Sequence, residues 1–271
     1  MNADAATVSN DVMAGILMTM NIAIFAPVFL LVIWKLRKKC KLLPALAGAL
    51  TFVNAALILE SIPKLFLFSG TNPVSVFILG HPFVFALTGA LLAGIFEECG
   101  RYVTFRYVLA NHSAKETAVT CGIGHGGIEC IIVAGVAMVS NLAYAFLIND
   151  GQIAAIMQTL PAEDAATLQT VVDTLTTADF MMFAWGIWER TFALILHISL
   201  SVLVFAAVKM KSRFHLLFPI AILLHTLMDI PAGLYQAGVL PLIPTELIIA
   251  TFSVGCAVFA YKIYPRLDET S

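Results

Sequence analysis

Apolar runs of about 20 residues recur along the chain and are separated by short polar joints. A helix of that length crosses the hydrocarbon core of a bilayer, whereas the strands of a membrane barrel have about 10 residues of alternating polarity. Of the 271 residues, 60% are hydrophobic and 12% are charged, against about 25% charged in an average soluble domain. The sequence therefore predicts an all-α, polytopic transmembrane bundle.

The apolar runs predict seven spans. Their expected bounds are residues 12–34, 42–59, 81–110, 122–147, 181–208, 214–236 and 242–264. A shorter apolar stretch at 73–80 leaves eight spans as the alternative, with the extra helix beginning near Val74. Because no soluble domain or internal repeat is visible, we expect a single membrane domain over residues 1–271.

Basic residues predict the orientation of the spans. Five of the seven residues at 35–41 are Lys or Arg. Further basic residues stand at the ends of later spans, at Arg101, Arg106, Lys115, Lys209, Lys211, Arg213, Lys262 and Arg266. Cytoplasmic loops carry such residues in excess, so these ends are expected inside, with the C-terminus. The polar tail at 1–11 and the acidic loop at 149–180 are then outside, and 162–176 within that loop favours an amphipathic surface helix.

Charge and cysteine usage exclude other classes. The net charge is −2, and the basic residues cluster at membrane edges without forming a continuous patch, so no nucleic-acid partner is expected. The five cysteines are scattered and include no CxxC pair, which argues against a disulfide framework. The expected surroundings of the chain are membrane lipids.

Ionisable residues interrupt the predicted spans. The ten positions are Glu97, Glu98, Arg101, His125, Glu129, Glu189, Arg190, His197, His225 and Asp229. Seven of them are formally charged, and leaving these unpaired in lipid would cost about 17–25 kcal/mol on insertion scales. Because the ten positions come from four spans, we expect them to meet in one polar cavity inside the bundle.

Helical spacing places several of these side chains on common faces. Arg101 follows Glu98 by three residues and Glu97 by four, so it can reach either carboxylate. The other same-face pairs are His125 with Glu129, His225 with Asp229, and Glu189 with His197 two turns later. Glu189 and Arg190 are adjacent and point about 100° apart, so we expect each to bind a partner on another span.

Such a set suits hydrolysis by an activated water. A carboxylate that is poorly solvated and lies beside a second carboxylate becomes a stronger base and can take a proton from water. Neighbouring imidazoles can donate hydrogen bonds to the oxyanion of a tetrahedral intermediate. This chemistry would cleave a peptide bond without a metal and without a covalent intermediate.

Three of these motifs resemble those of a known group of enzymes. Glu97-Glu98 with Arg101, then His125, then His225 with Asp229 are similar to the EExxxR, FxxxH and HxxxN/D motifs of the CAAX protease and bacteriocin-processing (Abi) superfamily of glutamate intramembrane proteases. Two departures are visible. The arginine is one residue closer to the pair, and Cys121 stands where FxxxH has phenylalanine.

The YhfC-type membrane peptidase family, which shares that superfamily's polytopic fold, is more similar still. The likeness covers residues 15–262 and rests on the stretches 98–101, 124–129 and 189–190. It implies the proteolytic activity of an intramembrane peptidase. We expect the protein in the plasma membrane of a prokaryote, with a peptide or membrane-protein substrate. No cofactor and no metal is expected.

The resemblance also implies roles for residues. Glu97, or Glu98 as the alternative, would activate water together with His125, while His225 and Asp229 would stabilise the oxyanion. Arg101 would hold a glutamate in place electrostatically, and the supporting residues would be Glu129, Glu189, Arg190 and His197.

Other classes of protein fit the same residues. A divalent metal held by the His, Glu and Asp side chains would make the chain a membrane metalloprotease or a cation transporter. Against these readings, HExxH is absent, no two histidines stand four apart, and no inverted repeat is visible. A catalytically silent membrane scaffold with the same fold is the third alternative.

Overall fold

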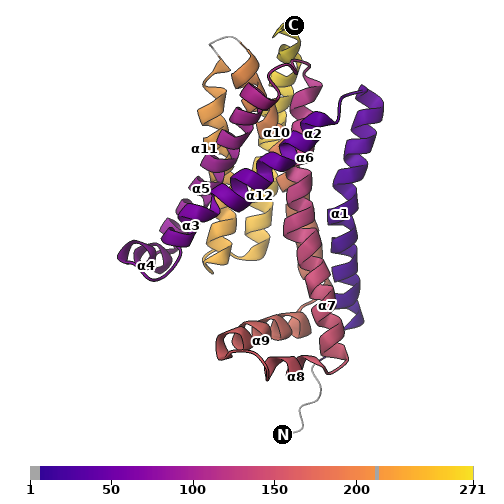
Figure 1. Cartoon of the computed structure of the whole chain (residues 1–271), viewed down its shortest axis with the longest axis vertical. Helices are drawn as coiled ribbons and strands as arrows, with labels where there is room; N and C mark the ends of the chain where they lie inside the picture. Colours follow the sequence, from indigo (N-terminus) through magenta and orange to yellow (C-terminus); the bar gives the residue numbers. More distant parts are fainter. Residues whose placement is uncertain (1–6, 211–213, 271) are drawn as a thin grey trace. The chain divides into compact units, whose positions relative to one another are not determined.

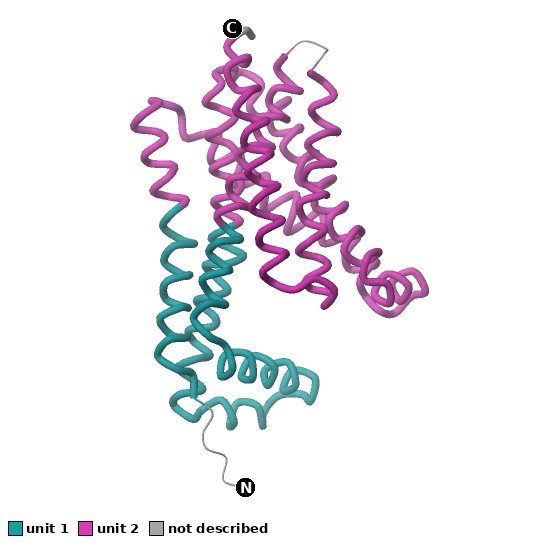
Figure 2. The backbone as a smooth tube through the Cα atoms, turned by 180° about the vertical axis from the view of Figure 1, so that it is seen from behind, with its two compact units in different colours: residues 1–26, 130–190 teal, residues 27–129, 191–271 magenta. Residues whose placement is uncertain are grey.

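The computed structural model describes residues 7–210 and 214–270, and these residues form helices joined by short turns, with no strand among them (Figure 1). The chain divides into two compact units (Figure 2). Unit 1 comprises residues 1–26 and 130–190, and unit 2 comprises residues 27–129 and 191–271. The single membrane domain expected from the sequence stays a prediction.

The helices follow the predicted spans closely. They are α1 (Asn10–Lys38), α2 (Leu43–Phe52), α3 (Ser61–Leu67), α4 (Pro73–Gly80), α5 (Pro82–Val103), α6 (Glu116–Glu129), α7 (Ala137–Asn149), α8 (Ile153–Met157), α9 (Ala162–Thr177), α10 (Phe180–Lys209), α11 (Leu217–Gln236) and α12 (Leu242–Ile263). π-Helical turns join α2 to α3 and α6 to α7, and another extends α5 to Val108. Such turns widen a helix locally and occur often at functional sites.

Seven continuous helices within the described residues are long and apolar enough to cross a membrane, which confirms the seven-span prediction. The alternative eighth span is not formed, because the stretch near Val74 gives only the eight residues of α4. At 1.5 Å per residue, α4 is about 12 Å long, too short to cross the bilayer core. The first six residues of the expected polar tail lie outside the described residues, as do Lys211 and Arg213.

Unit 1 contains the predicted amphipathic helix as α9. Its Leu168, Val172 and Leu175 recur at helical spacing and are buried in an apolar cluster with residues of α1, α7 and α8. The acidic side chains of α9 and all of its threonines except the partly buried Thr176 are exposed. The helix predicted at 162–176 is therefore confirmed as a helix.

Unit 2 is built around the second half of α10 and around helix pairs that approach closely. Residues 202–207 of α10 are all buried, and α5 and α11 lie side by side (Figure 1). A Cβ on Gly94 of α5 would lie 2.5 Å from Thr226 Oγ1 of α11, and one on Gly124 of α6 would lie 1.9 Å from the carbonyl oxygen of Ala45. Small residues let membrane helices approach to this distance, so both glycines are required by packing.

Replacing Gly124 with alanine should destabilise the bundle, because the added methyl group meets backbone atoms that cannot turn aside. We expect Gly124→Ala to cost about 1–3 kcal/mol, seen as a lower thermal midpoint of the detergent-purified protein. Gly255→Ala on α12 is the matched control, since a Cβ there meets nothing within 4 Å. Its midpoint should stay unchanged or rise, and equal midpoints for the two variants would contradict the packing.

Candidate active site

Eight of the ten predicted ionisable residues form one connected group in unit 2. We call it the acid–histidine cluster; its members are Glu97, Glu98 and Arg101 of α5, His125 and Glu129 of α6, His197 of α10, and His225 and Asp229 of α11. Glu98, Arg101 and His125 have no exposed surface. The four spans therefore bring their polar side chains together as expected.

Arg101 lies at the centre of the cluster. Its Nη1 forms an ion pair with Glu98 Oε1, and its Nη2 lies 3.8 Å from Glu97 Oε2. Nη2 also lies 2.5 Å from His197 Nδ1. Glu98 Oε1 accepts a second hydrogen bond, at 2.7 Å, from Nδ1 of His225. The guanidinium thus joins α5 to α10, and through Glu98 to α11.

Glu97, the other glutamate of the pair, is bound by a different histidine. His125 Nε2 lies 2.8 Å from Glu97 Oε2 and donates to it, because an ionised carboxylate only accepts. The imidazole of His125 packs edge-on against Phe52, with 5.4 Å between ring centroids. Its Nδ1 is buried and has no hydrogen-bond partner among the described residues. Glu97 and Glu98 therefore face different histidines.

The remaining contacts surround His197 and His225. Glu129 pairs with His197 Nε2, while His197 Nδ1 points toward Glu97 Oε2 at 3.9 Å. Asp229 Oδ2 lies 3.5 Å from His225 Nε2, and its side chain, 29% exposed, is the most open of the cluster. Each of the two imidazoles thus has a carboxylate at each nitrogen.

The cluster carries an excess of negative charge. With neutral imidazoles, its four carboxylates face one guanidinium, which leaves three negative charges uncompensated. An uncompensated buried charge costs several kcal/mol, so the site favours additional positive charge. Protons on the imidazoles or a bound cation would supply it.

Three members of the cluster fit a divalent metal. Glu97, His197 and His225 are buried, and each offers one ligand atom within 4.8 Å of the others. Nitrogen and carboxylate oxygen donors are those that zinc takes in catalytic sites, at about 2.0–2.2 Å, so at tetrahedral angles the three atoms would have to close to about 3.4 Å from one another. Each candidate ligand also contacts a further polar side chain. The pairs are Glu97 with His125, His197 with Glu129, and His225 with Glu98. Carboxylates behind ligating histidines are typical of metal sites.

Glu189 and Arg190 are arranged differently from the prediction. Arg190 Nε donates to Glu189 Oε2 at 3.1 Å, and Nη2 pairs with Oε1 of the same carboxylate. The expectation that these neighbours do not pair with each other is therefore wrong. The long arginine side chain with its planar fork spans the 100° between adjacent helix positions. Both residues belong to unit 1.

Two buried acids were missed in the sequence. Glu60 follows the predicted second span and lies inside the observed one, Leu43–Leu67; it is 2% exposed and forms an ion pair with Lys64 at 2.6 Å. Glu246 is 5% exposed within α12. The signal that selected the other ten residues, an ionisable side chain inside an apolar span, also applied to Glu246.

Comparison with known proteins agrees with the resemblance to the YhfC-type family. The model of the family described as "YhfC intramembrane metalloprotease" matches residues 22–252. The chain is also 34% identical over 261 residues to the "Uncharacterized membrane protein YhfC" of Bacillus subtilis (strain 168), covering 95% of this chain and 99% of that protein. No solved structure matches.

These matches bear on the family and on the metal. The predicted family and the predicted integral membrane location are confirmed, and a bacterial relative supports the plasma membrane. The family description names a metalloprotease, whereas no metal was expected from the sequence. The chain therefore belongs to the YhfC intramembrane metalloprotease family.

Proposed function

We propose that this protein is an intramembrane peptidase whose acid–histidine cluster binds a divalent cation and cleaves peptide bonds of membrane-protein substrates. The observation that carries this proposal is the convergence of Glu97, His197 and His225, all buried, with donor atoms within 4.8 Å. The three uncompensated negative charges of the cluster favour the same conclusion. The family description supports it independently.

The hydrogen bonds of the cluster leave one nitrogen of each imidazole that could hold a cation. Glu98 occupies Nδ1 of His225, which leaves Nε2 of that ring as the donor atom. Glu129 occupies Nε2 of His197, which leaves Nδ1. A divalent cation held there would supply Lewis-acid activation of water and of the scissile carbonyl.

The two glutamates then have different roles. Glu98 is wholly buried, and its Oε1 is bound by both Arg101 and His225, so it positions these two side chains. Glu97 is oriented by His125, and the same oxygen, Oε2, faces His197 Nδ1 at 3.9 Å, so Glu97 is the glutamate that would contribute to the reaction centre. Asp229 Oδ2 is the group that takes and returns a proton, because its side chain combines partial exposure with a position near His225 Nε2.

A second candidate is a metal-independent peptidase that uses a glutamate-activated water. Two contacts favour it. The 2.8 Å bond between His125 and Glu97 is the geometry of a general base with its orienting partner. Arg101 Nη2, at 2.5 Å from His197 Nδ1, already places a cation beside the nitrogen that a metal would use. In this mechanism Glu97, oriented by His125, takes the proton from water, and His225 with Asp229 stabilises the oxyanion.

Metal content separates the two candidates. Protein purified in detergent with a histidine-free tag should contain about one equivalent of zinc or another divalent metal by mass spectrometry. His197→Ala and His225→Ala should lose it, while Glu163→Gln on the exposed face of α9 should retain it. Cleavage of a membrane-peptide library should stop with 1,10-phenanthroline and return when zinc is added.

Other results would point elsewhere. Metal-free protein that cleaves at full rate in the presence of the chelator would support the glutamate-type mechanism. Bound metal with ion flux into vesicles and no cleavage would indicate a transporter. Protein that contains no metal and shows no cleavage would support the third alternative, a catalytically silent membrane scaffold.

Substitution of the two glutamates should separate reaction from stability. Glu97→Gln should fold normally and lower cleavage by about 100-fold or more, because Glu97 faces the reaction centre. Glu98→Gln should instead lower the thermal midpoint, because removing one partner of a buried ion pair costs about 3–5 kcal/mol.

The double variant Glu98→Gln/Arg101→Met provides the control. It removes both buried charges and should recover much of the lost stability. If Glu98→Gln proved as stable as the native protein and as inactive as Glu97→Gln, the assigned roles would be reversed.

A further inference from the structure

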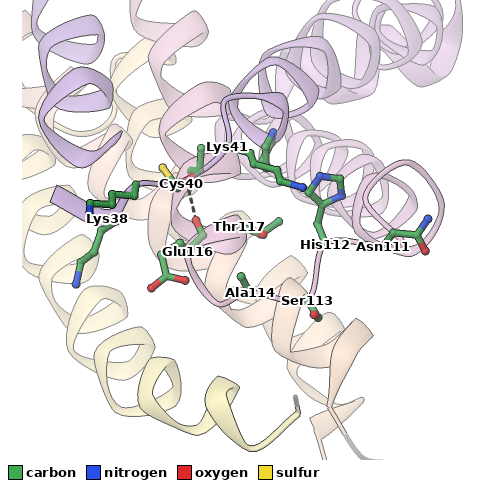
Figure 3. A pocket seen from close by; sticks show the side chains of 12 residues that line it. Lys38, Cys40, Lys41, Asn111, His112, Ser113, Ala114, Glu116 and Thr117 are labelled. Carbon is green, nitrogen blue, oxygen red and sulfur yellow. Dashed lines mark hydrogen bonds between the residues drawn. The ribbon is translucent and has the colours of Figure 1, made fainter. Parts of the chain in front are cut away.

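A cavity of about 340 Å³ lies in unit 2 between the loop that follows α1 and the start of α6 (Figure 3). Its polar lining includes Lys38, Lys39, Lys41, His112, Thr117 and Thr120. No member of the acid–histidine cluster lines it, so the cavity is a separate site.

The cavity is positively charged. Three lysines line it against one carboxylate, that of Glu116. Lys38 lies 5.7 Å from the centre of the Trp34 ring, whereas Lys39 and Lys41 form no ion pair with any described residue. The two unpaired ammonium groups are therefore available to an anion.

Two further groups in the cavity have unused hydrogen-bonding capacity. Thr117 is only 5% exposed, and its hydroxyl forms no hydrogen bond within residues 7–210 and 214–270. Nδ1 of His112 is buried and likewise has no partner there. The nearby Thr120 differs, because its hydroxyl donates to Glu116 O at 2.7 Å and accepts from Trp34 Nε1 at 3.1 Å. An anion with several acceptor oxygens would satisfy the first two groups.

The surroundings of the cavity indicate a lipid. Apolar side chains flank the lysines in sequence and are exposed, with Leu36 at 73%, Leu42 at 43% and Leu43 at 50%. Basic residues at the cytoplasmic end of a span bind anionic lipid headgroups, and the positive-inside rule predicts this end to be cytoplasmic. We propose that the cavity binds the phosphodiester of an anionic phospholipid such as phosphatidylglycerol, whose acyl chains lie along the exposed leucines.

Trp34 can report on this site, because its indole bonds to Thr120 of the cavity wall. The chain has three tryptophans, so Trp185→Phe/Trp188→Phe leaves Trp34 as the sole emitter. Reconstituted into vesicles, this protein should be quenched more strongly by phosphatidylglycerol with brominated acyl chains than by brominated phosphatidylcholine. Lys39→Gln/Lys41→Gln in the same background should reduce that preference, expressed as the ratio of the binding constants for the two lipids, about thirtyfold. Thr117→Val should reduce the ratio several-fold.

The control pair is Lys35→Gln/Arg37→Gln, which removes the same charge from the same helix end but from residues that do not line the cavity. It should change the preference less than threefold, with circular dichroism confirming that each variant is folded. Equal loss for the two pairs would show diffuse surface attraction and overturn the proposal. Equal quenching by the two lipids would overturn it as well. Millimolar inorganic phosphate that relieves the quenching would show that the cavity binds soluble phosphate and overturn the lipid source.

Discussion

The buried ion pair between Arg101 and Glu98 is the interaction on which the rest of the site depends. Both side chains are wholly inside the protein, and either charge alone would be strongly destabilising there. Each of the two charges can be buried at this position only because the other charge is present. The same guanidinium contacts His197, and the same carboxylate binds His225. One ion pair on α5 therefore fixes the imidazoles of two other helices.

Close helix packing is what allows these short contacts. Gly94 lets α11 approach α5, and Gly124 lets α2 approach α6. The bonds of 2.7 to 2.8 Å from Glu98 to His225 and from Glu97 to His125 join helices of the same unit. Because uncharged glycine contacts set the distance between helices, the charged groups need not supply the packing energy. The excess negative charge of the cluster can then serve binding or catalysis.

Much of this arrangement followed from the sequence, and the failures have physical reasons. Length and apolarity defined the spans, and the cost of charge in lipid selected the residues of the cluster. The spacing of Arg101 from Glu98 and Glu97 correctly predicted contacts within α5. Spacing gives the face of a helix but not the helix opposite, so the pairing of Glu129 with His197 was not predictable. An angle between adjacent positions also ignores side-chain reach, which is why the prediction for Glu189 failed.

The two proposed mechanisms differ in the position of one charged group. Arg101 Nη2 now lies against His197 Nδ1, the nitrogen that Glu129 leaves for a metal. If the guanidinium stays, it is the local cation, and Glu97 with His125 must activate water alone. If it turns fully to Glu98, a metal can take the nitrogen and compensate more of the excess charge. His125 orients Glu97 in both cases, so its role is independent of the choice, and the choice itself rests on Arg101.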